Sequence, residues 1–482
     1  MTISSALLSA RTGLDAIGAR ADLVATNVAN ASTPGYVRRA LTVSETILGG
    51  ETAGVAITGV DRSENARLTA ERRNLGSDFA QSEVLSATWS SLSQRIGDDI
   101  DGSTLFQRLS SLQTAMADAA LSPESATTAN QVVQSANDLV SEFQALSSLI
   151  AQERTRADQD IATGVDIVNA SLLEIQELNR SISSIDRSTA QAAALFDERD
   201  RVLDRISEYL PIQTFERDSG AIDVLTKEGV FLVAGPAQQI SFTPANVVGP
   251  NQTLANGGLS SLMVGETDIT PGAGTFGAVS SGAFGALFTL RDSDLPALGM
   301  QLDTMAQDLI DRFSDPAIDP TNPVGSPGLF VDTDPAAGTG IAGRLELNAL
   351  VDPDRGGAVW RLRDGLGATV PGSPGDTTIL TALNTAFDEA RTISAPGLQG
   401  TYTATDLIAQ IGALAGQQRI QNDAVRSSIS LQYDTVKQAE TNETAVDIER
   451  EMQDLLIIEQ AYAANARVIQ TASQMLNQLM EI

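Results

Sequence analysis

The chain has 482 residues and contains neither cysteine nor histidine, and its 61 acidic residues against 31 basic ones give a net charge of −30. The missing cysteines exclude disulfides and thiolate chemistry, and the missing histidines remove the commonest general base and metal ligand. The negative charge opposes binding to nucleic acid or to an anionic membrane, so neither partner is expected, and no cofactor or metal is expected. With 42% hydrophobic residues the chain can form real cores, in two to four domains.

The first helix is predicted from a heptad pattern in which apolar residues alternate at intervals of four and three. The pattern is made by Ile3, Leu7, Ala10, Leu14, Ile17, Ala21, Val24 and Val28. Such a helix cannot bury its apolar stripe alone, so it needs a partner helix.

A turn follows this helix. Pro34 and Gly35 suit the central positions of a type II turn, and the proline favours an extended Thr33, so the helix is expected to end here. Residues 40–60 mix Val, Ile and Thr with glycines and predict a short extended segment or hairpin.

Helical patterns dominate from about 63 to 210, with a break predicted at Gly97-Asp98-Asp99. Ser122, Pro123 and Glu124 have the form of a helix start, and the apolar pattern that follows predicts about 60 residues of helix, with a bend or a hidden turn left possible. Another helix should stop at Pro211. Within it, Asp197 and Arg199 are interpreted as part of a solvated face with local ion pairs.

The middle of the chain changes character at Pro211. Residues 211–282 and 316–379 are rich in Gly, Pro and polar residues and predict two lobes with strands and loops, while 283–313 is expected to be helical. Gly272–Gly277 matches G-x-G-x-x-G but lacks the buried strand of a dinucleotide site, so a flexible loop is predicted. Asp332-Thr333-Asp334 and Asp352-Pro353-Asp354 are interpreted as Asx turns and not as calcium sites.

The last helix is predicted from a second heptad pattern near the carboxyl end. Its positions are Ile448, Met452, Leu455, Glu459, Tyr462, Ala466, Ile469, Ser473, Leu476 and Met480. Polar Glu459 and Ser473 either set the register of packing or face solvent or a lumen, and the sequence leaves both open. Two such patterns at opposite chain ends favour a pair of helices with the rest of the chain looped out between them.

The expected fold is mainly α with β-rich middle lobes, in three parts. Residues 1–45 and 435–482 form a terminal helical coiled coil, and residues 46–210, 283–315 and 380–434 form a helical bundle. Residues 211–282 and 316–379 form the loop-rich outer lobes.

Two segments resemble the bacterial flagellar axial proteins, and within them the hook-associated protein 1 family. The first is the amino-terminal motif made by Asn27, Asn30, Thr33, Pro34, Gly35, Tyr36 and Arg38. The second is the carboxy-terminal run that includes Gln460, Ala461 and Tyr462. Weaker similarities lie near 196–200 and 281–292, and the long helical region from 63 to 210 favours this family over hook and distal rod proteins.

The resemblance implies a structural protein, not an enzyme, at the junction between flagellar hook and filament, outside the cell. It implies export without a cleaved signal peptide, with an export chaperone, and assembly into a homo-oligomeric ring. The hook protein would lie on one side, and a second junction protein (hook-associated protein 3) and the filament on the other. The assembly interface would use Ile3, Leu7, Leu14, Ile17, Val24, Val28, Ile448, Met452, Leu455, Tyr462, Ile469 and Leu476.

Three further expectations complete the sequence-based picture. The terminal helices should be frayed in the free chain, because there they lack lateral partners. A hook or distal rod protein of the same superfamily remains an alternative function. A carboxylate-only hydrolase on the middle lobes is a remote one, and it would need a cleft with paired carboxyl groups.

Overall fold

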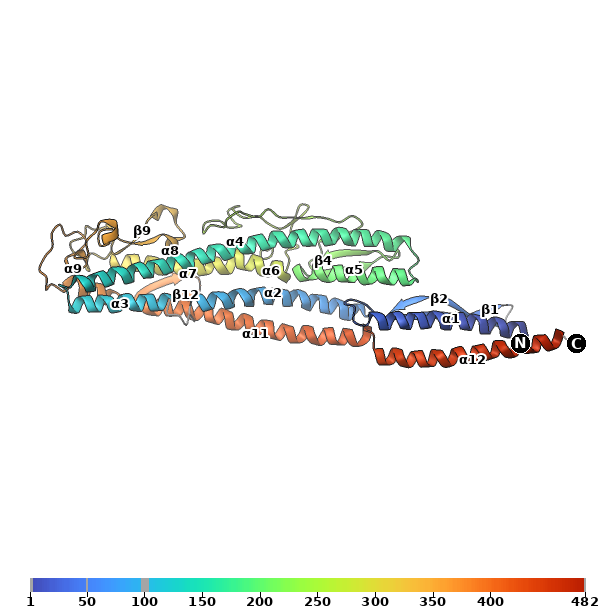
Figure 1. The fold of residues 1–482 in the computed structure, drawn as a ribbon. Helices are drawn as coiled ribbons and strands as arrows, with labels where there is room; N and C mark the ends of the chain where they lie inside the picture. Colours follow the sequence, from blue (N-terminus) through green and yellow to red (C-terminus); the bar gives the residue numbers. More distant parts are fainter. Residues whose placement is uncertain (1–2, 49–50, 97–103, 481–482) are drawn as a thin grey trace.

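The computed structural model describes residues 3–48, 51–96 and 104–480, and it shows a long molecule (Figure 1). A body of helices and loops occupies one part, and a pair of terminal helices projects from it, with both chain ends at the projecting tip. The predicted break at 97–99 lies outside the described residues.

The projecting part consists of α1 (Ile3–Asn30), α12 (Ile448–Met480) and a hairpin of β1 (Arg39–Leu48) and β2 (Glu51–Arg62). α1 packs along α12 and also contacts both strands (Figure 1). The predicted pairing of the two terminal helices and the predicted hairpin are therefore confirmed, while coiled-coil geometry in the strict sense stays a prediction.

The body is built around long helices. These are α2 (Ala66–Ile96), α3 (Leu105–Leu121), α4 (Ala126–Ser184), α5 (Ala190–Tyr209), α7 (Leu295–Phe313) and α11 (Ala404–Thr444). α4 runs for 59 residues without a turn, about 90 Å at 1.5 Å per residue. Its start was predicted too early: Ser122 to Ser125 form a turn, and the Ser125 hydroxyl caps the helix by accepting from the Thr128 amide at 3.4 Å.

Two hydrophobic cores hold the body together. One lies between α4, α3, α7 and the beginning of α11, and the other lies between α4, α5, α6 (Gly282–Thr289) and the small sheets. Between α6 and α7 the chain forms a π-helical turn, η1 (Leu290–Asp294), so the predicted helix over 283–313 is confirmed with this irregularity.

The small sheets are all antiparallel. Their strands are β3 (Ile212–Glu216), β4 (Ile222–Thr226), β5 (Phe231–Val233), β6 (Ile240–Ser241), β7 (Met263–Val264), β8 (Thr267–Asp268), β9 (Phe330–Asp332), β10 (Leu345–Leu347), β11 (Arg391–Ala395) and β12 (Leu398–Tyr402). The β3–β4 and β4–β5 hairpins confirm the turns predicted after Pro211. The outer lobes are otherwise more loop than strand, because most of these strands have only two or three residues.

Short helical segments complete the lobes. They are η2 (Pro335–Ala337), α8 (Ile341–Arg344), η3 (Pro353–Arg355), α9 (Arg361–Asp364) and α10 (Thr378–Ala386). Gly272–Gly277 lies in turns and loop after β8, as predicted. The Asx-turn interpretation is also confirmed, since Asp332 and Asp352 each accept from the amide two residues ahead, at 3.0 Å.

α11 is one continuous helix that packs along α2, and it continues past residue 435, where the predicted terminal part begins. The chain leaves this helix at 445–447 and then starts α12. The structure thus places the change from body to projection about ten residues later than the expected boundary, while the three-part division itself stays a prediction.

Candidate assembly surface and its joint

The amino-terminal motif forms a tight loop at the end of α1. The Tyr36 amide donates to the Thr33 carbonyl at 3.1 Å, and Gly35 between them has a φ of +76°, the left-handed value required at the third position of a type II turn. The predicted turn is confirmed. An added Cβ on Gly35 would lie 2.8 Å from Arg201 Cγ, so the turn also packs closely on α5.

Asn27 is the centre of a buried hub that joins the two chain ends. Its side-chain nitrogen donates to the Arg39 carbonyl at 2.9 Å and to Glu451 Oε2 at 3.2 Å. Its oxygen accepts from the Tyr36 hydroxyl at 2.9 Å, and burial raises the pKa of that phenol. The motif is therefore a structural connection between α1, the turn and α12.

Glu451 completes the hub from the carboxy-terminal side. Its carboxylate is fully buried and accepts from Arg38 Nε at 2.6 Å, while Arg38 also lies 3.5 Å from Asp454. The Arg38 amide donates to the Thr444 carbonyl at 2.9 Å, just before α12 begins. A charged group this buried is tolerated because charged or amide donors occupy both of its oxygens.

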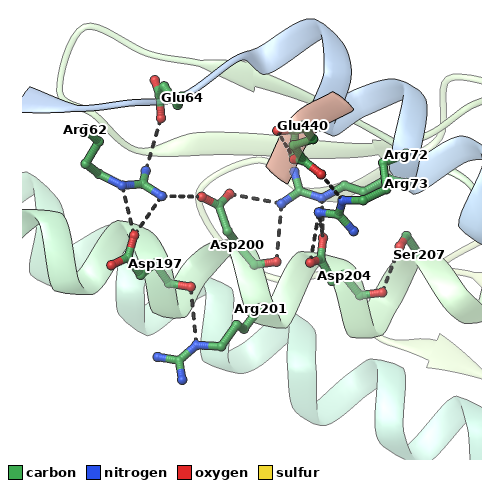
Figure 2. Close-up of polar contacts among 11 residues, drawn as sticks. Arg62, Glu64, Arg72, Arg73, Asp197, Asp200, Arg201, Asp204, Ser207 and Glu440 are labelled. Atoms are coloured by element: carbon green, nitrogen blue, oxygen red, sulfur yellow. Dashed lines mark hydrogen bonds and ion pairs between the residues drawn. The ribbon is translucent and has the colours of Figure 1, made fainter. Parts of the chain in front are cut away.

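A row of ion pairs ties the base of the hairpin to α5 (Figure 2). Arg39 and Arg62 are direct cross-strand partners. Their two positive charges repel each other unless an anion lies between them. Asp197 supplies that anion, at 2.8 Å from Arg39 and 2.9 Å from Arg62, and all three side chains are at most 8% exposed.

The row continues along α5 toward α2 and α11 (Figure 2). Asp200 accepts from Arg62 at 2.8 Å and from Arg73 at 3.0 Å. Burial alone would raise the pKa of Asp200, but Arg73 and Arg62 outweigh it, and the pKa lies below its usual value. Asp204 then pairs with Arg73 at 2.7 Å and with Arg72 at 3.0 Å, and Arg72 also pairs with Glu440 of α11.

The interpretation of Asp197 and Arg199 as a solvated helix face is wrong. Both side chains are buried, and Arg199 donates to the Gly220 carbonyl at 2.6 Å. Polar spacing on a helix does not reveal burial by elements far away in sequence. The signal that could have found them was the motif similarity at 196–200.

The similarity near 281–292 also marks buried structural residues. Arg291 pairs with Asp158 of α4 at 2.6 Å, with both side chains fully buried, and lies 4.5 Å from the Phe288 ring centroid. A Cβ on Gly282, whose φ is +86°, would lie 2.3 Å from the Tyr209 carbonyl oxygen. These residues fix the internal packing of the body.

The predicted stripe on α1 faces the molecule. Ala10 and Val24 are buried, and the other predicted interface residues of this helix are partly buried: Ile3, Leu7, Leu14, Ile17 and Val28.

The face of α12 that meets α1 is not the predicted one. Glu451, Ile458 and Ala472 are buried there, and Asn465 approaches Gly13 so closely that a Cβ on this glycine would lie 3.3 Å from its Oδ1. Gly13 and Ala472 are small enough to let the two helices come close, and Glu451 belongs to the hub. The sequence pattern instead selected the row with the largest apolar side chains.

That row remains uncovered within one chain. Its large side chains are 37–53% exposed, and we call them the outer stripe: Ile448, Met452, Leu455, Tyr462 and Leu476. Ile469 and Ala466 are partly buried at its edge, and Glu459 and Ser473 are exposed, so in the single chain these two polar residues face solvent. Of the carboxy-terminal motif residues, Gln460 is exposed and Ala461 partly buried.

A surface cleft of about 1210 Å³ bears on the hydrolase alternative. Asp303 and Asp308 line it. Asp303 accepts from the amides of Gly340 and Ala342, at 2.6 and 2.9 Å. Burial raises the pKa of Asp308, which pairs with Arg312 at 2.5 Å. Two further aspartates line the cleft: Asp332 pairs with Arg344 at 2.9 Å, and Asp311 accepts from the Gln307 side-chain amide at 2.7 Å. All four carboxylates therefore have structural partners, which disfavours a catalytic pair.

Among the described residues, no three acidic side chains gather in a way that could hold a metal ion. Within the same ranges, no helix has the length and apolar character required to span a bilayer.

Comparison with known families agrees with this architecture. Residues 90–316 match the family described as flagellar hook-associated protein FlgK helical domain, and residues 438–482 match the family described as flagellar basal body rod FlgEFG protein C-terminal. The first match runs from the end of α2 through α7 and includes the strands and loops between α5 and α6, and the second covers α12 together with the end of α11.

Individual relatives of this chain carry the name flagellar hook-associated protein 1. Flagellar hook-associated protein 1 of Escherichia coli K12 is 23% identical over 65% of this chain and 57% of its own length, and that of Salmonella typhimurium is 23% identical over 65% and 56%. The alignment thus spans little more than half of these two relatives. The Bacillus subtilis protein of the same name is 21% identical over 98% of this chain and 97% of its own length.

A solved structure, the flagellar hook junction protein FlgK from Burkholderia pseudomallei, is also similar. It has 17% identity and a TM-score of 0.45, over 54% of this chain and 46% of that one.

Paired terminal helices that project from a helical body, together with these matches, are typical of structural proteins of the bacterial flagellum. Within that class, the chain is similar to the flagellar hook-associated protein 1 family.

Proposed function

We propose that this chain is the subunit of a ring at the junction between the flagellar hook and filament, and that it self-assembles through its terminal helices. The observation that supports this most directly is the outer stripe of α12, a row of large apolar side chains with no cover inside the chain. The role is structural and not catalytic, and it places the protein outside the cell.

α12 has uncovered apolar residues on its other flank as well. Ile457, Val468 and Met475 are 45–56% exposed, so the helix is apolar on both sides of its contact with α1. A helix of this kind is typical of the interior of a bundle with several neighbours. In a ring, copies on either side would supply those neighbours.

The partners follow from the family and are part of the proposal. The ring would contact the hook protein on one side, and hook-associated protein 3 and the filament on the other. Export would proceed through the flagellar type III apparatus with a dedicated chaperone and without a cleaved signal peptide. We further propose that the free ends of α1 and α12 fray before assembly, because each helix then lacks lateral contacts.

The alternative of a hook or distal rod protein is favoured only by the match over residues 438–482. The match over residues 90–316 favours the junction role. Electron microscopy of cells lacking the protein, with a flagellin blot of the medium, separates the two. Bare hooks with shed flagellin are expected; absent hooks would indicate the rod or hook, and intact filaments would contradict both.

The assembly surface itself is tested by Tyr462→Asp in the full chain. Since Tyr462 is 53% exposed, the variant should fold normally yet leave hooks bare, because a carboxylate would be buried between copies. Gln474→Asp, at an exposed position of α12 outside the outer stripe, is the matched control and should give normal filaments. Ile469→Asp, at the stripe's edge, should resemble Tyr462→Asp. Normal filaments from Tyr462→Asp would contradict the proposed surface.

A further inference from the structure

The β1–β2 hairpin has an apolar face without a partner in the chain. Val43, Ile47 and Ile57 are 46–67% exposed, and Val43 and Ile57 are direct cross-strand neighbours. Three large apolar side chains on one small sheet form a local patch, which differs from the single exposed apolar residues that are common on protein surfaces.

The hairpin is also held rigidly, although a two-stranded sheet alone is marginally stable. Asp197 fixes its base through Arg39 and Arg62. The Val60 amide donates to the Ser188 carbonyl at 2.8 Å. Gly54, with a φ of +113°, lies against α1 so closely that a Cβ would be 2.2 Å from Thr12 Oγ1. The patch is thus presented on a fixed platform.

α1 separates this patch from the outer stripe of α12. It contacts the hairpin through Ser9 and Thr12, but it meets α12 through Gly13 and Arg20. In Figure 1 the strands and α12 lie along different sides of α1. One projecting unit therefore displays two different apolar surfaces.

We infer that the hairpin patch receives the outer stripe of a neighbouring copy of this chain. Two different surfaces that bind each other give a head-to-tail contact, and repetition of such a contact builds a ring when the rotation between copies closes. A contact between two identical stripes would instead stop at a dimer. The inference rests on the proposed function and assigns the second half of its interface.

The test uses the absence of cysteine in the natural chain, which gives cross-linking a clean background. Glu45, on the same face of β1 as Val43, and Ser473, in the row of the outer stripe, are both exposed. A full-length Glu45→Cys/Ser473→Cys variant replaces the wild type in cells, which are treated with a short bismaleimide. A ladder of linked chains longer than dimers is expected on a denaturing gel.

Controls identify the contact. Each single cysteine variant should give no ladder, and Ser473→Cys with Ser219→Cys, on the β3–β4 turn of the body, should give none either. A Thr58→Cys/Ser473→Cys variant, on the other strand of the hairpin, should repeat the ladder.

Motile cells with intact filaments but no ladder in either double variant would overturn the hairpin contact and leave the proposed function intact. Linked dimers without longer products would also overturn it. Failure of the proposed function would be seen separately, as intact filaments in cells that lack the protein.

Discussion

Asp197 is the residue on which the orientation of the projecting unit most depends. It lies between two arginines on adjacent strands, and without its charge Arg39 and Arg62 would face each other in a buried site. Removal of one partner from a buried ion pair costs about 3–5 kcal/mol, much more than the loss of a surface pair.

We therefore expect Asp197→Asn to lower the free energy of unfolding by about 3 kcal/mol or more and to expose the hairpin base to protease. Chemical unfolding followed by circular dichroism, with limited proteolysis, measures both. Asp138→Asn, which removes a surface pair with Arg108, is the control and should change stability by less than about 0.5 kcal/mol. Equal stability of the two variants would show that the buried pair has no special role.

Asp200 gives the joint a pH dependence with a defined sign. Its folded-state pKa is below the usual value because of Arg73 and Arg62, so it stabilises the fold at pH values above its unfolded-state pKa of about 3.9. That stabilisation is lost as the pH falls through the folded-state pKa, when the carboxyl group becomes protonated.

The wild type should therefore be more stable than Asp200→Asn at pH 7, and the difference should shrink below about pH 4. Parallel unfolding curves between pH 7 and 2.5 measure the difference, and other acid-sensitive groups cancel between the two proteins. A difference that stays constant down to pH 2.5 would contradict this assignment.

At the scale of elements, the hub around Glu451 connects α12 to the amino-terminal motif. Arg38 and Asn27 both depend on this one buried carboxylate. A hydrogen bond to a charged group contributes about 1.5–3 kcal/mol, so its loss should loosen the motif loop and the first turns of α12 together.

Glu451→Ala should increase hydrogen exchange of amides in residues 31–39 and 445–458 on the order of 10-fold or more, with little change in the body. Hydrogen exchange read by mass spectrometry resolves these segments. Glu449→Ala, an exposed neighbour on the same helix, should leave exchange unchanged. Faster exchange in only one of the two segments would show that Glu451 does not couple the two chain ends, and it would contradict the proposed hub.

At the scale of the whole molecule, the body and the projection are built differently. Every member of the two buried clusters lies between residues 89 and 415, so the cores of the body include no residue of α1 or α12. The projection has no comparable core within the described residues and depends on its joint, and by our proposal on neighbouring copies.

A fragment of residues 64–444 should therefore fold as a helical unit with a cooperative thermal transition, although without Arg39 and Arg62 it should melt several degrees below the full chain. Circular dichroism and scanning calorimetry test this. A fragment without a cooperative transition would show that the terminal helices are part of the body's stability.

The sequence by itself determined the local elements and the resemblance to a family. Apolar periods predicted α1, α4 and α12, Pro34-Gly35 predicted the turn, and the terminal motifs indicated the superfamily, because these signals depend on neighbours along the chain. It did not predict β11 and β12, where five-residue strands lie in a segment of mixed pattern.

Only the tertiary structure decided which faces are covered. α12 is apolar on several sides, and the face that meets α1 carries the buried residues Glu451, Ile458 and Ala472, while the outer stripe stays free. Asp197 resembles a solvated helix residue until Arg39 and Arg62 are brought to it from more than a hundred residues away. Burial and charge pairing are properties of packed elements, and a one-dimensional pattern cannot assign them.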